Sequence, residues 1–118
     1  MNAMLTTQVL DTAHGCPAAG MQIELWAVSE GAEDLLKTVR TNAEGRPPEP
    51  LLEGEQMIAA TYELVFHVGD YFLHRGGAGN GTPFLDTVPV RFGITEAGVS
   101  CHVPLIVSPW AYTDCRGS

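Results

Sequence analysis

The chain has 118 residues, of which 45% are hydrophobic and 17% are charged. A chain of this length buries about two thirds of its unfolded surface in one core, so we expect a single domain over residues 1–118. The net charge is −8, from 14 acidic and 6 basic side chains. Because nucleic-acid binding depends on clustered lysines and arginines, this balance argues against a nucleic-acid partner.

The sequence also lacks membrane and disulfide signatures. It holds no run of about 18 apolar residues, and its start has neither a basic segment nor a long apolar one. We therefore expect no membrane partner and a cytosolic protein. The cysteines at positions 16, 101 and 115 are odd in number and lack C-x-x-C spacing, which predicts reduced thiols rather than a disulfide framework or a zinc ribbon.

Two strands are predicted near the start of the chain. In residues 5–11 the side chains alternate at period two, and Thr6 and Gln8 share the more polar face. Residues 21–28 follow a Gly/Pro-rich turn and alternate in the same way, with a Gln/Glu face toward water.

A turn that carries an arginine occupies the middle of the chain. Residues 35–41 are a third strand candidate, and the segment 42–50 that follows contains an asparagine, a glycine and three prolines. These residues exclude a helix interior and a central strand, so Arg46 lies on a loop.

The second half of the chain predicts three more strands, over residues 59–68, 84–94 and 101–112. A short helix or turn is expected at 69–77, and 95–100 has the length of a hairpin turn. Pro89 and Pro104 fall inside the last two strands and require edge positions or bulges. The predicted strands are separated by turn-forming residues, and at most one short helix is expected. This pattern favours an antiparallel β-sandwich over an α/β fold.

A few side chains are candidates for chemistry. The four histidines show neither H-x-H nor H-x-x-x-H spacing, so the spacing predicts no metal site. His102 begins an apolar strand, where a core-edge histidine and a general base both fit. Arg46 fits either a solvated side chain or an oxyanion clamp. Cys115 qualifies as a nucleophile only if a neighbour such as Arg116 lowers its pKa.

Several segments together resemble one family, the 5-hydroxyisourate hydrolases, which are related to transthyretin. They are "LTTQVLDTAHGCPAAG", "NAEGR", "PFLDTVPVRFGI", "HVPLIVSPWAY" and the terminal "RGS", in the family's order from Leu5 to Ser118. The resemblance implies an all-β, transthyretin-like sandwich of two four-stranded antiparallel sheets with one short helix. It also implies a homotetramer, a dimer of dimers with active sites in the grooves between dimers.

The family's reaction opens the ring of 5-hydroxyisourate, the product of urate oxidation, by adding water at a ring carbonyl without metal or organic cofactor. By matching motif, Arg46 and His102 stand where the family has its arginine and its second histidine. The resemblance implies that His102 acts as the general base and that Arg46 stabilises the oxyanion. It places Arg116, Gly117 and Ser118 in a tail that folds into the substrate groove.

The chain departs from the family pattern at two positions. Gln8 stands in place of the first-strand histidine and Cys115 in place of the tail tyrosine. Glutamine can position a water or a carbonyl but does not titrate near neutral pH, so one proton-transfer partner is lost unless His14 compensates. Two alternatives follow: a divergent paralogue that opens another heterocycle, with Cys115 as a covalent nucleophile, or a non-catalytic binding protein, as vertebrate transthyretin binds thyroid hormone.

Overall fold

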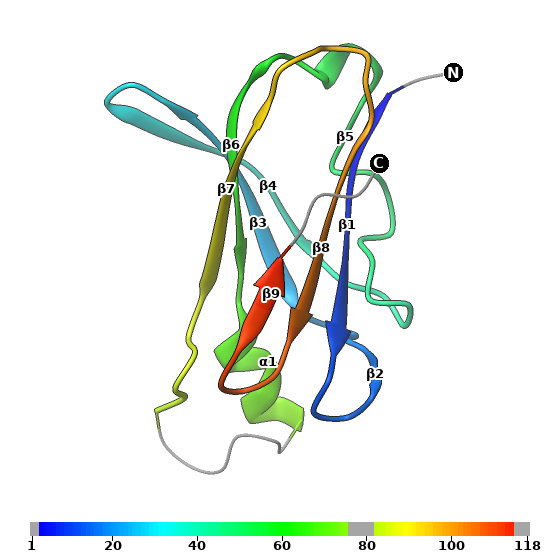
Figure 1. Ribbon diagram of the computed structural model, residues 1–118, viewed down its shortest axis with the longest axis vertical. Coiled ribbons are helices and arrows are strands. Elements are labelled where there is room, and N and C mark those ends of the chain that lie inside the picture. The colour runs from blue at the N-terminus through cyan, green and yellow to red at the C-terminus, as the bar shows by residue number, and fades with distance from the viewer. Residues whose placement is uncertain (1–2, 76–81, 115–118) are drawn as a thin grey trace.

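The structure is a computed structural model that describes residues 3–75 and 82–114. In these residues two β-sheets pack face to face, with one α-helix at one end (Figure 1). The longer strands are β1 (Met4–Asp11), β3 (Gln22–Ser29), β4 (Ala32–Arg40), β6 (Ala60–Phe66), β7 (Val88–Ile94) and β8 (Cys101–Val107). The shorter elements are β2 (Cys16–Pro17), β5 (Leu52–Glu53), the 3₁₀ turn η1 (Gly54–Gln56), the helix α1 (Val68–Arg75) and β9 (Tyr112–Asp114).

The two sheets differ in strand count and in strand direction. The first sheet has the order β2-β1-β8-β9, with β5 also paired to β1, and the second has the order β4-β3-β6-β7. The all-β sandwich is confirmed, but the predicted count of four strands fails for the first sheet, because two-residue pairings from the flanking loops extend it. The prediction of purely antiparallel sheets is also wrong, because β1 and β8 run parallel.

The segment 95–100 is not a hairpin turn, contrary to expectation. It connects β7 in the second sheet to β8 in the first, so the chain crosses between sheets there. Pro89 lies on β7, an edge strand, as predicted. Pro104 lies on β8, which has strands on both sides, but the described pairing with β9 begins only at Leu105. Proline has no backbone N–H to donate, and Pro104 lies outside the described part of the β8–β9 pairing, so no hydrogen bond is missing there.

Alternation along the strands sets the core. On β1, Leu5 and Val9 are buried between the sheets while Thr6 and Gln8 lie on the outer face. Strands from both sheets contribute similar inward apolar side chains to one continuous cluster. Burial at about 25 cal/mol per Å² of apolar surface makes this cluster the main stabilising term, and it fixes which face of β1 and β8 meets solvent.

Helix α1 closes one end of the sandwich, where the sequence predicted a short helix or turn. Its buried side is built from Val68, Tyr71 and Phe72, a helical spacing. At Gly69 the backbone packs so closely on the segment after residue 81 that an added Cβ would lie 2.9 Å from the Leu85 carbonyl oxygen. No helix in the described parts of the chain has the length and apolar character needed to cross a membrane.

Candidate functional site

Thr6 and His102 lie side by side on the outer face of the first sheet. They are direct partners in the parallel β1–β8 pairing, 96 positions apart in the chain. Their side chains are joined by a 2.8 Å hydrogen bond between the Thr6 Oγ1 and the His102 Nδ1. A hydroxyl both donates and accepts, so this bond supports either neutral tautomer and also the imidazolium. With Nδ1–H donating to Oγ1, the lone pair of Nε2 is available to take a proton.

The turn over residues 42–46 gives Arg46 its position. The Asn42 side-chain Oδ1 accepts hydrogen bonds from the backbone N–H of Glu44 at 2.9 Å and of Arg46 at 3.2 Å. Two backbone bonds between Asn42 and the residues Gly45 and Arg46 close the same turn. An asparagine that binds the backbone beyond it is a typical turn former, so the sequence "NAEGR" holds Arg46 in a defined loop.

Gly45 lets this turn dock against β1. Its carbonyl accepts a 2.9 Å hydrogen bond from the backbone N–H of Val9, and its φ is +77°. A Cβ at this position would collide with the Val9 carbonyl oxygen, so both the conformation and the close approach require glycine. The turn is therefore fixed beside the same strand that carries Thr6.

Thr6, Arg46 and His102 line one open hollow of about 320 Å³. Met4 and Ser100 form part of its rim, and a smaller hollow of about 190 Å³ adjoins it on the side of the prolines after Arg46. Within the described residues, no carboxylate lies within 4.0 Å of the Arg46 guanidinium. The hollow therefore combines a histidine with an arginine that forms no ion pair with any acidic side chain of the described residues.

Gln8 lies on the same outer face but does not line the hollow. Its Nε2 donates a 3.1 Å hydrogen bond to the carbonyl oxygen of Glu44, within the turn that carries Arg46. The amide therefore ties β1 to that turn, and its Oε1 stays available as an acceptor. Of the residues singled out from the sequence, the structure brings His102 and Arg46 together and places Gln8 beside them.

His14 does not take the place of the missing first-strand histidine. It follows the other end of β1, whose last residue, Asp11, is about 16 Å from Thr6 at the rise of an extended strand. Its Nδ1 donates to the Asp11 Oδ2 at 2.7 Å, and its ring stacks on Phe72 with a centroid distance of 6.3 Å. This histidine belongs to a structural network under α1.

The network at that end of β1 centres on a buried carboxylate. The Tyr71 hydroxyl donates to the Asp11 Oδ2 at 2.7 Å, and the backbone N–H of His14 donates to the Oδ1 at 3.0 Å. Burial alone would raise the pKa of the Asp11 carboxyl, but the hydrogen bonds from Tyr71 and His14 outweigh it and lower this pKa below its ordinary value. Burial, together with the bond to Asp11, raises the pKa of Tyr71 above its ordinary value.

Sequence reasoning missed Thr6 as a site residue, although a signal was present. Period-two alternation already put it on the exposed face of β1 with Gln8, and only the pairing of β1 with β8 was needed to set it against His102. The other candidates, Cys115, Arg116, Gly117 and Ser118, lie outside the described residues.

Comparison with known proteins now defines the family. Residues 5–117 match the HIUase/Transthyretin family, which confirms the predicted transthyretin-like fold. A protein of Rhizobium meliloti named 5-hydroxyisourate hydrolase 2 is 50% identical over 97% of this chain and 95% of its own, and a 5-hydroxyisourate hydrolase of Halalkalibacterium halodurans is 48% identical over all of both. The crystal structure of (S)-allantoin synthase superposes with a TM-score of 0.92 at 42% sequence identity. The match covers 99% of this chain and 44% of that protein. The chain belongs to the HIUase/Transthyretin family.

Proposed function

We propose that this protein is a cofactor-independent hydrolase that opens the ring of 5-hydroxyisourate. The observation that carries the proposal is that His102 and Arg46, from segments far apart in the sequence, line one hollow with Thr6. Near-full-length relatives at 48% and 50% identity carry the name 5-hydroxyisourate hydrolase, which supports the choice of substrate.

The proposed chemistry assigns proton transfer to one side chain and charge stabilisation to another. His102 Nε2 takes a proton from water as the water oxygen bonds to the ring carbonyl carbon. Arg46 stabilises the negative charge that develops on the carbonyl oxygen. When the carbon–nitrogen bond of the ring breaks, the departing nitrogen takes the proton back from His102. General acid–base catalysis contributes about 10²- to 10⁴-fold and an oxyanion donor about 10²- to 10³-fold.

Gln8 has a supporting role in this proposal. Its amide holds the turn of Arg46 against β1, and its Oε1 can accept a hydrogen bond from substrate or water. Cys115, Arg116, Gly117 and Ser118 are proposed as substrate-binding residues, on the strength of the family motif alone. Two arginines, at 46 and 116, would then supply positive charge for an anionic ligand.

We also propose that the protein acts as a homotetramer, a dimer of dimers. Met4, Leu10 and Ile106 lie on the outer face of the first sheet and are each 38–40% exposed. This face also carries the hollow, so a second copy packed against it would bury apolar surface and enclose the site. Light scattering of the purified protein measures the mass of the assembly. Ile106→Glu is expected to lower that mass, and a monomeric wild type would contradict the proposed tetramer.

The test of function follows the decay of 5-hydroxyisourate generated in place by urate oxidase. Wild type and Gln8→His are compared with His102→Gln and with buffer, and the ultraviolet absorbance of the intermediate is recorded. Decay above buffer with wild type, abolished in His102→Gln, supports the proposal. Decay only with Gln8→His would mean that the wild-type site acts on another heterocycle. Decay with neither protein would contradict 5-hydroxyisourate as the substrate.

A further inference from the structure

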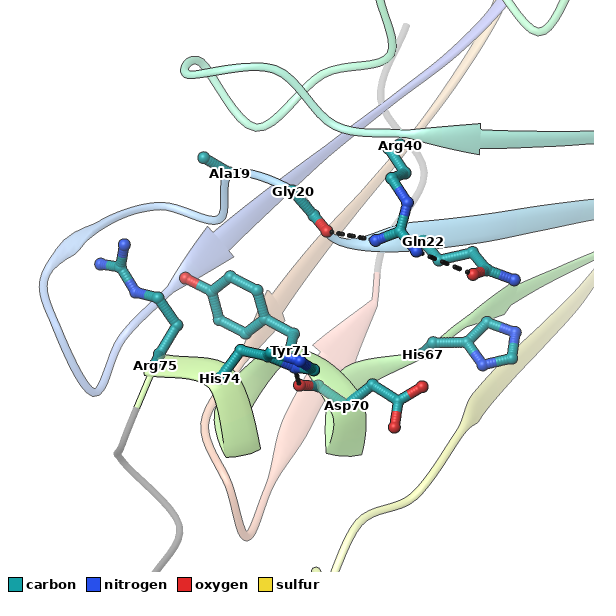
Figure 2. Close-up of a pocket in the computed structure, with 9 residues that line it drawn as sticks. All are labelled: Ala19, Gly20, Gln22, Arg40, His67, Asp70, Tyr71, His74 and Arg75. Carbon is teal, nitrogen blue, oxygen red and sulfur yellow. Dashed lines mark hydrogen bonds between the residues drawn. The ribbon is translucent and has the colours of Figure 1, made fainter.

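A second cavity, of about 320 Å³, lies at the α1 end of the molecule, away from Thr6 and His102. Figure 2 shows its lining side chains, with Tyr71, His74 and Arg75 coming from α1 and Arg40 from β4 on the other side. The loop before β3 and the start of that strand complete the wall. None of these side chains takes part in the proposed hydrolysis.

Positive charge is concentrated at this cavity in an otherwise acidic protein. The whole chain has six lysines and arginines against 14 acidic side chains, yet Arg40 and Arg75 both line this one space. Two of the four histidines, His67 and His74, line it as well. Such clustering on a chain of net charge −8 creates a local positive potential that attracts anions.

No acidic side chain forms an ion pair with either arginine of the cavity. All 14 acidic side chains lie in the described residues, and none of their carboxylate oxygens is within 4.0 Å of the Arg40 or Arg75 guanidinium, although Asp70 also lines the cavity. Arg91 shows the contrast, since it bridges Glu33 at 3.3 Å and Glu63 at 3.0 Å. Arg40 and Arg75 therefore share this cavity without an acidic side chain bound to either guanidinium.

The Arg40 guanidinium is held in place by neutral acceptors. Its Nη1 donates to the Gly20 carbonyl oxygen at 3.1 Å and its Nη2 to the Gln22 Oε1 at 3.3 Å (Figure 2). A guanidinium has five N–H donors, so these two bonds orient it and leave other donors for a ligand. The positive charge is kept, because both partners are uncharged.

On the α1 side of the cavity, the Arg75 guanidinium is also held by uncharged neighbours. The Arg75 guanidinium lies over the Tyr71 ring at 5.8 Å and donates to the Cys16 sulfur, a weak acceptor, at 3.4 Å. The Tyr71 hydroxyl is engaged by Asp11, so the ring is a fixed wall. His74 donates from Nδ1 to the Asp70 carbonyl oxygen at 2.7 Å, which fixes the orientation of its ring at the cavity.

We propose that this cavity is a binding site for a small oxyanion, a carboxylate or a phosphate, held between Arg40 and Arg75. Arginine's planar fork suits both groups, and the volume accommodates a phosphate ion or a short dicarboxylate. The acidic groups facing the site are Asp70 and, across His67, Glu24, whose Oε2 lies 3.2 Å from the His67 Nε2. They limit the net positive charge, so a small anion fits this site better than a highly charged one.

The test titrates the full chain with inorganic phosphate and, separately, with succinate, while sodium chloride keeps the ionic strength constant. Amide NMR spectra report the location and calorimetry the affinity. Wild type and Arg91→Gln, which removes an arginine outside the cavity, should bind with equal affinity and shift the amides of Gly20, Gln22 and α1. Arg40→Gln and Arg75→Gln should each weaken binding about 10-fold or more, the effect of losing a hydrogen bond to a charged group.

The two titrations decide whether the cavity binds an oxyanion and which kind it prefers. Preference for phosphate or for succinate identifies the oxyanion class and supports the site. Absence of binding by both probes, or equal affinity in Arg40→Gln, Arg75→Gln and wild type, overturns it. Far-UV circular dichroism checks the fold, and Arg40→Lys, which keeps the charge but loses the fork, is the second variant and should bind more weakly than wild type.

Discussion

The two ends of β1 hold a histidine in opposite ways. At the start of the strand, His102 from β8 shares a 2.8 Å hydrogen bond with the hydroxyl of Thr6 and faces an open hollow. Past its other end, His14 is held at 2.7 Å by the carboxylate of Asp11, which is itself buried. The same residue type is thus bound to a neutral partner in one place and to an anion in the other.

The partner decides what each histidine can do. A carboxylate can only accept, which fixes Nδ1 as a donor, so His14 serves as a structural clamp between β1 and α1. A threonine hydroxyl satisfies the ring before and after protonation, which is what a residue that takes and returns a proton requires. Proton transfer is therefore expected at the Thr6 end, and stability at the Asp11 end.

The largest expected effect separates the two histidines by activity. His102→Gln should lower kcat for 5-hydroxyisourate about 10²- to 10⁴-fold, because the general base is removed while a hydrogen-bonding side chain remains. The matched variant His14→Gln should keep most of the activity and lower the unfolding free energy by about 1–2 kcal/mol. Steady-state kinetics and urea unfolding of both proteins measure the two quantities.

The opposite pattern would contradict the assignment of roles. If His14→Gln abolished turnover while remaining folded, or if His102→Gln kept wild-type kcat, the proton-transfer site would not be at Thr6 and His102. A parallel loss of stability in His102→Gln would make its kinetic effect uninterpretable, so the unfolding curve of this variant is the necessary control.

A second prediction concerns the buried carboxylate at the other end of β1. Asp11→Asn should lower the unfolding free energy by about 2–3 kcal/mol at neutral pH, because the side chain that accepts from Tyr71 and His14 loses its charge. The folded pKa of Asp11 is depressed, so its contribution is fully present above the ordinary value of 3.8 and is lost as pH falls through the folded value.

Wild type should therefore lose stability faster than Asp11→Asn as the pH falls below about 4. Urea unfolding at a series of pH values from 7 to 3 measures the difference between the two proteins. Parallel curves over this range would show that the carboxylate is not stabilised in the folded state. Tyr71→Phe, which removes one donor and keeps the ring, should fall between them.

Local patterns predicted much of the fold and the individual side chains of the site. The period-two alternation of β1 assigned Thr6 and Gln8 to the outer face, and the turn residues of "NAEGR" put Arg46 on a loop. Both predictions depend on steric and hydrogen-bonding preferences within a few residues, which the sequence displays directly. Local sequence also predicted a short helix or turn where α1 lies.

The partnership between Thr6 and His102 was beyond local reasoning. Alternation says which face a residue occupies but not which strand lies beside it, and these two residues meet only because β1 and β8 pair in parallel across 96 positions. The orientation of Gln8 had the same origin, since its amide binds Glu44 in a turn docked on β1 by long-range contacts. Register between distant strands is a tertiary property set by core packing.

The smallest predicted effect tests the hydroxyl of Thr6. Thr6→Val keeps the shape and removes the hydrogen bond to the His102 Nδ1, so the ring loses both its orientation and its partner when charged. We expect kcat to fall about 10-fold with KM little changed, and Thr6→Ser to restore most of it. A purely structural role would instead lower stability and leave the pH profile of kcat unmoved. Equal kcat and an identical pH profile in Thr6→Val and wild type would show that the hydroxyl does not position the base.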